Sequence, residues 1–398
     1  MLLYDTARQQ IVPFDPPDHI VTMYTCGITP YDSTHLGHAA TYLTYDVLQR
    51  RLRDLGHETR CVRNITDVDD SILPKAKELG VHYLDLAASE LARFDADMER
   101  LEMLPAWSEP RATSAIADIR GFIGMVLDQG FAYQAGGAVY FEVSKFPKFG
   151  QISHLNRDEM LLLAKERGGN PDDPHKRDPL DFVLWQPSQP DEPAWDSLWG
   201  PGRPGWHIEC SALCLRELGT SIDLHGGGSD LIFPHHECEA AQSEAATGEP
   251  LVRHWMHQAM VRMDGEKMSK SLGNLVFVSD LSLTWDPRAI RLACLSHHYR
   301  SSWEWHDSLM SQATTRLLAW VAASSASAAN SVPANSVPAN PAPPALDQVR
   351  TALDADLDTP AALLAIDVAA AAGEDVQQAA QLLGVDLTRP VLLTGDPV

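Results

Sequence analysis

The sequence predicts an α/β fold in which a parallel sheet is interrupted by an insertion and followed by a C-terminal helical region. The run HIVTMYTCGIT is apolar and rich in β-formers, and the residues after it follow a helical pattern that ends at Gly56. The run ETRCVRNITDVDD then indicates a second strand, which completes a strand–helix–strand unit of the kind that builds parallel sheets. Two further strand patterns, SIDLHGGGSDLIF and HWMHQAMVRMDG, follow after a long interval.

The interval between the two pairs of strands predicts two kinds of structure. Residues 74–135 contain good helix formers at amphipathic spacing, which predicts helices. Residues 136–200 are interrupted by Gly, Pro and Asp, so we expect an insertion that rests on the sheet. Gly and polar residues at the strand ends of such a sheet are where ligands usually bind.

The C-terminal part is expected to be helical on both sides of a linker. Residues 288–320 follow a helical pattern. Residues 321–345 are an Ala/Ser/Pro/Asn tract that contains SVPAN twice in tandem and has no apolar periodicity, which predicts a flexible linker. The last 53 residues predict a short helical module, in which Thr359 is the N-cap and Pro360 occupies the first helical position.

The composition limits the classes of partner. The 398 residues include 31 basic and 54 acidic side chains, a net charge of −23. This balance disfavours broad binding to a phosphate backbone, which relies on clustered Lys and Arg. The sequence contains neither a secretory signal pattern nor a stretch of membrane-spanning length, so we expect a cytoplasmic protein that does not bind a membrane. In that compartment the six scattered cysteines favour core thiols and metal ligands over disulfides.

Two short motifs carry basic side chains that suit a nucleotide. In THLGHAA, His35 and His38 lie where the first strand meets a helix, and backbone N–H groups at such a junction favour an anion. Taken alone, two such histidines are more often surface or satisfied core residues. In GEKMSKSLGN, Lys267 and Lys270 lie in a Gly/Ser-rich loop. Two flexible ammonium groups suit the charge that spreads over a triphosphate when its α-phosphorus is attacked.

Together the two motifs resemble the catalytic core of a class I aminoacyl-tRNA synthetase, in which the nucleotide lies between them. The resemblance implies catalytic roles for His35, His38, Lys267 and Lys270. It implies that residues 1–110 form the first half of a Rossmann catalytic core. It further implies that residues 111–200 form a connective-peptide-like insertion and that residues 201–285 form the second half of the core with the lysine loop. A helical region (286–320), the linker (321–345) and the C-terminal module (346–398) follow.

Sulfur and imidazole groups are available at separate strand ends. Cys26, Cys210 in GWHIECSA and His235 in DLIFPHHECEAA form no CxxC pair, so a closed structural zinc site is disfavoured. Each of them alone is more often a core thiol or a capped histidine. Together they resemble the zinc site of the cysteine-activating branch of the family. The resemblance implies one Zn²⁺ per chain, held by Cys26, Cys210 and His235, with Glu239 as a further candidate ligand.

Zinc would explain how such a site selects its amino acid. Cysteine and serine differ by one atom, and a pocket without a metal discriminates poorly between such similar side chains. Zn²⁺ deprotonates a coordinating thiol but binds a neutral hydroxyl weakly. A zinc site with an open position therefore selects cysteine by its thiolate.

Two relatives share this core, and they differ in the acceptor of the cysteine. One is cysteinyl-tRNA synthetase, and the other is the mycothiol-pathway ligase, whose acceptor is the amine of 1D-myo-inositol 2-amino-2-deoxy-alpha-D-glucopyranoside (glucosaminyl-inositol). The stretches CGITPYDSTHLGHAATYLTYD, ERGGNP, DLDTPAAL and LLGVDL resemble the ligase. His225 and Glu239 resemble the synthetase instead. The part after Ser271 has six arginines, no lysine and thirteen acidic residues, whereas a tRNA-gripping extension should be basic and longer.

We therefore expect an ATP-dependent, AMP-forming ligase that converts L-cysteine to cysteinyl-AMP and transfers it to glucosaminyl-inositol, with Mg²⁺ accompanying ATP. The resemblance implies a monomer, and tRNA is disfavoured as the acceptor. Cysteinyl-tRNA synthetase is the alternative, and an inactive zinc-dependent cysteine or adenylate binder is an alternative of another class. The resemblance places these residues against ATP or the cysteinyl adenylate: Cys26, Gly27, Ile28, Thr29, Thr41, Asn64, Ile65, Thr66, Trp206, Gly228, Ser229, Asp230 and Val261.

Overall fold

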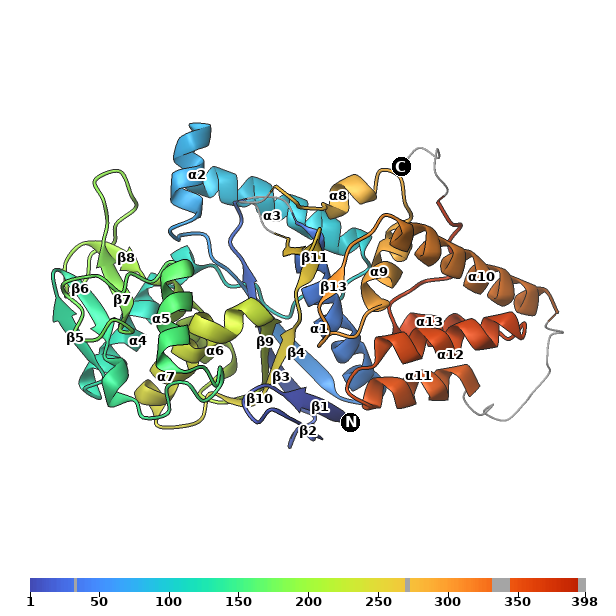
Figure 1. Cartoon of the computed structure of the whole chain (residues 1–398), viewed down its shortest axis with the longest axis horizontal. Coiled ribbons are helices and arrows are strands. Elements are labelled where there is room, and N and C mark those ends of the chain that lie inside the picture. The colour runs from blue at the N-terminus through green and yellow to red at the C-terminus, as the bar shows by residue number, and fades with distance from the viewer. Residues whose placement is uncertain (32–33, 269–272, 331–343, 393–398) are drawn as a thin grey trace.

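The centre of the molecule is a parallel sheet with the strand order β10-β9-β3-β4 (Figure 1). The computed structural model describes residues 1–31, 34–268, 273–330 and 344–392. Met23 of β3 pairs with Cys61 of β4 on one side and with Leu224 of β9 on the other, which confirms the predicted α/β fold. The strands are β3 (Ile20–Ile28), β4 (Glu58–Ile65), β9 (Ile222–Gly228) and β10 (Val252–Gln258).

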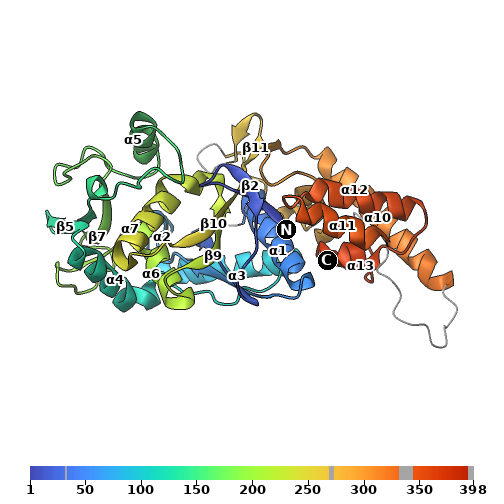
Figure 2. The same cartoon turned by 90° about the horizontal axis from the view of Figure 1, so that it is seen from below.

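The sheet lies between two apolar cores, and neighbouring side chains on a strand enter opposite ones. Met23 and Met256 belong to the core on the α1 side, whereas Tyr24 and Trp255 belong to the core on the α6 side. Burial on both faces accounts for the nearly continuous apolar runs in the strands. Figure 2 shows helices on both sides of the sheet. The helices of this part are α1 (Leu36–Asp54), α2 (Ile72–Leu79), α3 (Tyr83–Arg100), α6 (Trp206–Leu218), α7 (Glu237–Thr247), α8 (Val278–Leu281) and α9 (Pro287–Leu295).

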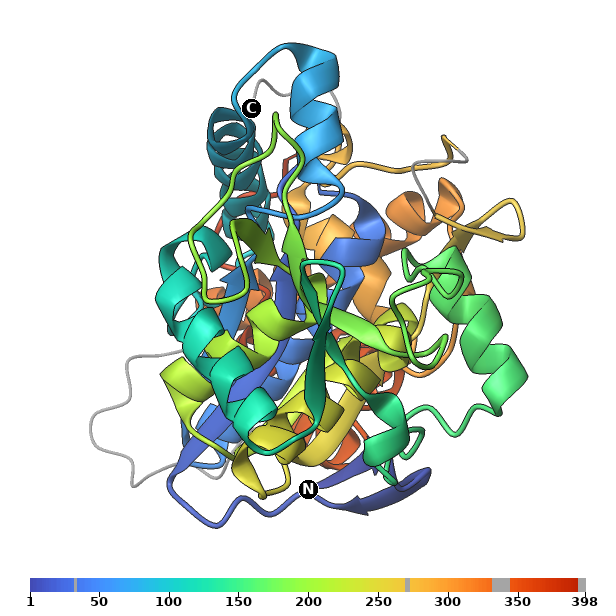
Figure 3. The same cartoon turned by 90° about the vertical axis from the view of Figure 1, so that its left-hand side faces the viewer.

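The insertion has an antiparallel sheet of its own, with the order β5-β6-β7-β8, and faces the viewer in Figure 3. Glu237 at the start of α7 fixes the insertion to the core, because its carboxylate accepts hydrogen bonds from the N–H groups of Gly150 and Ser153 at 2.7 and 2.9 Å. The elements are α4 (Ile116–Asp128), β5 (Ala132–Ala135), β6 (Ala138–Phe141), α5 (Arg157–Glu166), β7 (Phe182–Pro187) and β8 (Gly202–Pro204).

Two small sheets flank the core. One is a hairpin of β1 and β2, and the other has the order β12-β11-β13 and contains Lys267 of the lysine loop in β12. These strands are β1 (Leu2–Asp5), β2 (Gln10–Pro13), β11 (Val261–Met263), β12 (Glu266–Lys267) and β13 (Trp303–Glu304). Short 3-10 or π turns are η1 (Ala112–Ala115), η2 (Val143–Lys145), η3 (Ser229–Leu231) and η4 (Ile232–His236).

The C-terminal helices pack against the α1 side of the core rather than forming a separate module. Val349, Leu353 and Ile366 are buried in the same apolar core as Leu3 and Leu48. Figure 1 shows these helices beside α1 and α9. The expected tethered module is therefore part of the globular body. The helices are α10 (Ser308–Asn330), α11 (Pro344–Asp354), α12 (Thr359–Ala371) and α13 (Gln377–Leu382).

Two predicted boundaries in this region are wrong. Residues 321–330 are helical and not part of a linker, because Ala323 continues the apolar face that buries Trp320. The N-cap of α12 is Asp358, whose carboxylate accepts the Ala361 N–H at 3.0 Å, and Thr359 is already helical. Residues 331–343, which contain the SVPAN repeats, lie outside the described residues.

Two expectations from composition can be compared with the structure. In the described ranges, no helix combines the length and the apolar character that crossing a membrane requires. All six cysteines are free thiols and all are buried.

Candidate active site

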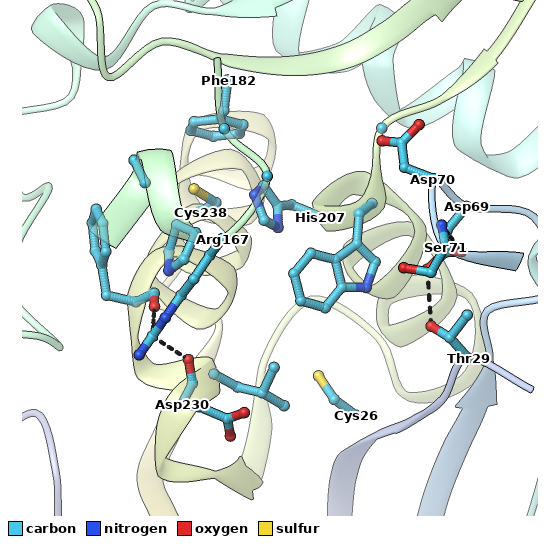
Figure 4. A pocket seen from close by; sticks show the side chains of 18 of the residues that line it. Cys26, Thr29, Asp69, Asp70, Ser71, Arg167, Phe182, His207, Asp230 and Cys238 are labelled. Atoms are coloured by element: carbon cyan, nitrogen blue, oxygen red, sulfur yellow. Dashed lines mark hydrogen bonds between the residues drawn. The ribbon is translucent and has the colours of Figure 1, made fainter. Parts of the chain in front are cut away.

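A cavity of about 1120 Å³ opens at the carboxyl ends of β3 and β9, where ligands bind in open α/β sheets. Its walls come from the end of β3, the first turns of α1 and α6, and the insertion. Figure 4 shows His207 between Phe182 of the insertion and Cys26 of β3. Beside Cys26, just after the end of β3, the Thr29 hydroxyl donates to Asp69 at 2.9 Å. The cavity therefore lies between the sheet and the insertion.

The two signature histidines lie at the N-terminus of α1. The Nδ1 atom of His35 accepts the Gly37 N–H at 3.1 Å, which makes His35 the N-cap of a helix that begins at Leu36. The ring of His38 stacks on that of His35, with centroids 3.7 Å apart. Both histidines line the cavity. Two imidazoles at a helix N-terminus form a surface that suits phosphate oxygens.

Gly27 brings β3 against the end of β4. A Cβ atom at this position would lie 1.5 Å from the carbonyl oxygen of Asn64, so only glycine fits. The Gly27 N–H donates to the Asn64 side-chain oxygen at 2.8 Å, and the Asn64 amide donates to Thr66 at 3.1 Å. Asn64 and Thr66 thereby hold the cavity wall in place from behind.

Gly226, in the glycine run at the end of β9, leaves room for a tyrosine side chain. A Cβ on Gly226 would lie 2.2 Å from the hydroxyl of Tyr45. That hydroxyl accepts the Gly227 N–H at 2.7 Å and donates to the Met256 carbonyl at 2.7 Å. The space left by Gly226 is therefore used by a tyrosine that joins β9, β10 and α1.

Four predicted ligand side chains meet beneath the cavity. One ligand atom each from Cys26, Cys210, His235 and Glu239 lies within 4.8 Å of the others, and all four residues are buried. Cys26 Sγ lies 3.3 Å from Glu239 Oε1, and His235 Nε2 lies 2.9 Å from the same oxygen. In a tetrahedral zinc site the ligand atoms are about 3.3 to 3.8 Å apart, given bonds of about 2.0 to 2.3 Å. Two thiols, an imidazole and a carboxylate are ligand types that zinc takes, and the 3.3 Å contact falls within this range, whereas the 2.9 Å contact between His235 and Glu239 has the length of a hydrogen bond.

The four side chains form a network of alternating charge. Burial raises the pKa of the Cys210 thiol, but hydrogen bonds from Cys26 and His235 outweigh burial and bring this pKa to about 6. Burial lowers the pKa of His235, but Glu239 and Cys210 raise it to about 10. Burial likewise raises the pKa of Glu239, but His235 and His225 hold it well below its usual range. These shifts favour an anionic Cys210 and an anionic Glu239 on either side of a protonated His235.

A second ligand set shares two of these residues. Cys26, His225, His236 and Glu239 also place ligand atoms within 4.8 Å of one another. Glu239 Oε2 lies 3.0 Å from His225 Nε2, and His236 Nδ1 lies 2.7 Å from a nitrogen of His257. Sequence reasoning did not find the position of His236, because only its neighbour His235 matches the family pattern. The pair of adjacent histidines was the available signal.

His207 is a further residue that sequence reasoning missed. Its Nδ1 atom lies 2.8 Å from the Nδ1 atom of His235, so it contacts the ligand on the side away from Glu239. Such a partner fixes the ring orientation of a metal-binding histidine. Its position next to Trp206 in the GWHIEC stretch gave no indication of this contact.

The lysine loop reaches the cavity through Lys267. Its ammonium donates to the Asp230 carboxylate at 2.7 Å, and both residues line the cavity. Arg167, in the ERGGNP stretch, donates to the carbonyls of Asp230 and Phe233 and so fixes the segment that leads to His235. Lys270 lies outside the described residues.

The structure divides the predicted adenylate contacts into two groups. The first group lines the cavity: Cys26, Gly27, Ile28, Thr29, Thr41, Trp206, Gly228, Asp230 and Val261. Among the described residues, a second group is not part of this lining: Asn64, Ile65, Thr66 and Ser229. Asn64, Ile65 and Thr66 are buried behind the wall, at the end of β4. These three residues therefore pack behind the residues that line the cavity and do not line it themselves.

Comparison with solved structures shows the fold of the chain. The chain is 18% identical to Mycobacterium tuberculosis methionyl-tRNA synthetase in complex with methionyl-adenylate, with a TM-score of 0.65 over 88% of this chain and 82% of that one. It is 11% identical to the Agrobacterium radiobacter K84 leucyl enzyme in a ternary complex with tRNA, with a TM-score of 0.62 over 96% of this chain and 88% of that one. At these identities the likeness shows a class I synthetase fold alone.

Comparison with the sequences of known proteins identifies the family of the chain. Residues 14–315 match the family described as the tRNA synthetases class I (C) catalytic domain. The L-cysteine:1D-myo-inositol 2-amino-2-deoxy-alpha-D-glucopyranoside ligase of Nocardiopsis dassonvillei is 49% identical over 92% of this chain and 87% of its own length. The ligase of the same name from Kribbella flavida is 48% identical over 96% and 93%. The chain therefore belongs to this ligase family, a branch of the class I synthetase-like enzymes.

Proposed function

We propose that this protein activates L-cysteine with ATP and joins it to the amine of glucosaminyl-inositol through an amide bond. The observation that carries the proposal is the 48% identity to a ligase of that name over 96% of the chain, which includes the C-terminal helices. The cavity between the sheet and the insertion supports this proposal, because an adenylate and an acceptor must meet in one site.

In the proposed first step, the cysteine carboxylate attacks the α-phosphorus of ATP and pyrophosphate leaves. His35 and His38 would donate to the phosphate oxygens from the N-terminus of α1. Lys267 would neutralise charge from the opposite wall, and Lys270 is proposed to act with it. Mg²⁺ is proposed to accompany the ATP.

The proposed metal is zinc, held by Cys26, Cys210 and His235, with Glu239 as a further candidate. A bound zinc ion would supply affinity for the thiolate of the substrate, which serine lacks. The protein would contribute the geometry of the set: Glu239 is held by His225, and His207 orients the ring of His235. Trp206 stacks on His235 with ring centroids 4.1 Å apart and faces the cavity.

In the proposed second step, the neutral amine of the acceptor attacks the carbonyl carbon of the adenylate. The new C–N bond forms, the bond between that carbon and the AMP oxygen breaks, and the amine loses one proton. Six carboxylates but only three Lys or Arg side chains are among the described lining residues, a balance that suits a cationic or neutral acceptor.

The C-terminal region also disfavours tRNA as the acceptor. All six arginines after Ser271 are in ion pairs with carboxylates, and the part has no lysine. Arginines held in this way are not available to neutralise phosphates. The pairs are Arg288–Asp286, Arg291–Asp46, Arg300–Asp356, Arg316–Asp367, Arg350–Asp54 and Arg389–Glu102.

A competition between acceptors tests the proposal. The purified protein is incubated with ATP and cysteine, together with glucosaminyl-inositol and tRNA at equal concentrations. We expect the amide product and AMP, with no charged tRNA. Charging of tRNA without consumption of the amino sugar would instead establish a cysteinyl-tRNA synthetase.

A further inference from the structure

The cavity has an insertion half whose use the first step does not explain. Its volume of about 1120 Å³ exceeds the range of about 300 to 1,000 Å³ that is typical of pockets for one drug-sized ligand. The sheet half contains the signature histidines and Lys267. The insertion half is lined by Tyr140, Lys176 and Gln186, which come from β6, from the segment before β7, and from β7.

Lys176 is a cation in this half whose ammonium has no hydrogen-bond or ion-pair partner among the described residues. The nearby acids are already engaged elsewhere. Asp181 accepts the Tyr133 hydroxyl at 2.7 Å and the Val143 N–H at 2.9 Å. Asp173 accepts the Tyr140 hydroxyl at 2.7 Å. Lys176 lines the cavity, and none of these contacts of the nearby acids involves its ammonium.

Gln186 is in the same situation. Gln186 lines the cavity, and its side-chain amide makes no hydrogen bond within the described part of the chain. An amide offers two donors and an acceptor, and an ammonium offers three donors. Groups of this kind left without partners in a cavity are suited to a ligand with many hydroxyls, which can accept and donate at several points.

The insertion half also lies close to the place where the cysteine would be activated. Lys176 acts electrostatically on His207 and on Cys238, which line the same cavity. His207 in turn contacts His235 of the ligand set. An acceptor bound beside Lys176 would therefore be next to the aminoacyl end of the adenylate.

The charge around Lys176 favours a neutral ligand over an anion. The carboxylates of Asp173, Asp178 and Asp181 attract its ammonium without contacting it, so their field opposes a further negative charge. Burial nevertheless lowers the pKa of the Lys176 amine. A polyol satisfies the donors of Lys176 without adding charge.

We infer that the insertion half is the acceptor subsite, in which Lys176 and Gln186 hydrogen-bond the hydroxyl groups of an amino-sugar polyol. This inference rests on the proposed function, because it assumes that the acceptor is glucosaminyl-inositol. It assigns the two residues to acceptor affinity and gives them no part in the activation of cysteine.

Three variants test the subsite by separating the two steps. Lys176→Met and Gln186→Met each remove the hydrogen-bonding group and keep a side chain of similar length. Lys165→Met is the matched control, because Lys165 is 68% exposed on α5 and is not part of the cavity lining. Cysteine-dependent ATP–pyrophosphate exchange measures the first step, and amide formation measures the second. Hydroxylamine serves as a small acceptor that needs no subsite.

We expect the KM for glucosaminyl-inositol to rise about tenfold or more in Lys176→Met and Gln186→Met, as for the loss of a hydrogen bond to a buried polar partner. Exchange and hydroxylamine trapping should stay at the wild-type level, and Lys165→Met should match wild type throughout. An unchanged KM, or exchange that falls in parallel, overturns the subsite. A wild-type protein that leaves glucosaminyl-inositol unconsumed overturns the proposed function itself.

Discussion

At the scale of single residues, the ligand set offers a comparison within one helix. Cys210 and Cys214 are both buried thiols on α6, one turn apart, but only Cys210 belongs to the set. We expect Cys210→Ser to weaken zinc binding at least tenfold, since a hydroxyl is a poor ligand. Cys214→Ser should bind zinc as wild type does. Competition with a chelator of known affinity measures both, and equal affinities would remove Cys210 from the set.

The lysine loop gives a kinetic prediction at the same scale. We expect Lys270→Ala to slow cysteinyl adenylate formation by roughly a hundredfold, because its interaction belongs mainly to the transition state. The affinity for ATP should change far less. Pre-steady-state pyrophosphate release and equilibrium ATP binding measure the two effects. Equal losses in both would assign Lys270 to ground-state binding.

The residue scale also shows what a sequence can and cannot reveal about a site. The residue types and family spacing of Cys26, Cys210 and His235 were sufficient to predict that they meet. The contacts of His207 and His236 depend on ring directions at the ends of α6 and η4, which no spacing encodes. The role of Gly226, which leaves room for Tyr45, likewise depends on a contact between β9 and α1 that the sequence does not reveal.

At the scale of elements, a buried ion pair joins helices that are far apart in the sequence. Arg291 of α9 pairs with Asp46 of α1 and donates to the carbonyls of Leu101 and Leu383 at 2.9 and 2.6 Å. We expect Arg291→Met to lower the free energy of unfolding by about 3 to 5 kcal/mol, because Asp46 would be left buried without its partner. Arg60→Met, which removes an exposed pair with Glu58, should cost less than about 1 kcal/mol.

The same pair predicts a pH dependence. Burial raises the pKa of Asp46, but Arg291 and Arg50 hold it below its usual value. Because the folded state binds this proton less tightly than the unfolded state, the stabilisation is complete above the unfolded pKa of about 3.9. It is lost as the pH falls further. The cost of Arg291→Met, measured by urea unfolding, should shrink in that acidic range, and a constant cost would contradict the assignment.

Element types were easier to predict than element ends. The apolar run rich in β-formers and the helical pattern after it predicted the parallel sheet, because both are local properties of the sequence. The extension of α10 through residues 321–330 depends on contacts with helices that follow later in the chain. A composition of Ala and Ser is compatible with both a helix and a linker. Asp358 and Thr359 are both good caps, so local preference did not decide between them.

At the scale of the whole molecule, the C-terminal helices contribute to the main core. Removing everything after residue 330 would take Val349, Leu353, Leu363 and Ile366 out of the core and expose the apolar side chains that they cover, and the burial of each is worth about 1.5 to 3 kcal/mol. Their sum is comparable to the total stability of a typical domain, about 5 to 15 kcal/mol, so we expect the truncated chain not to fold. Deleting one SVPAN repeat should leave the melting temperature and turnover intact. Thermal melting of both chains checks this, and a stable truncated chain would restore the separate module.

The central claim is that a metal held by Cys26, Cys210 and His235 selects cysteine beside an ATP site. The most direct measurement combines elemental analysis of the purified protein with ATP–pyrophosphate exchange driven by cysteine or by serine. We predict one zinc ion per chain and exchange with cysteine alone, both lost after chelation and restored by added zinc. A metal-free protein that still activates cysteine and rejects serine would contradict the account.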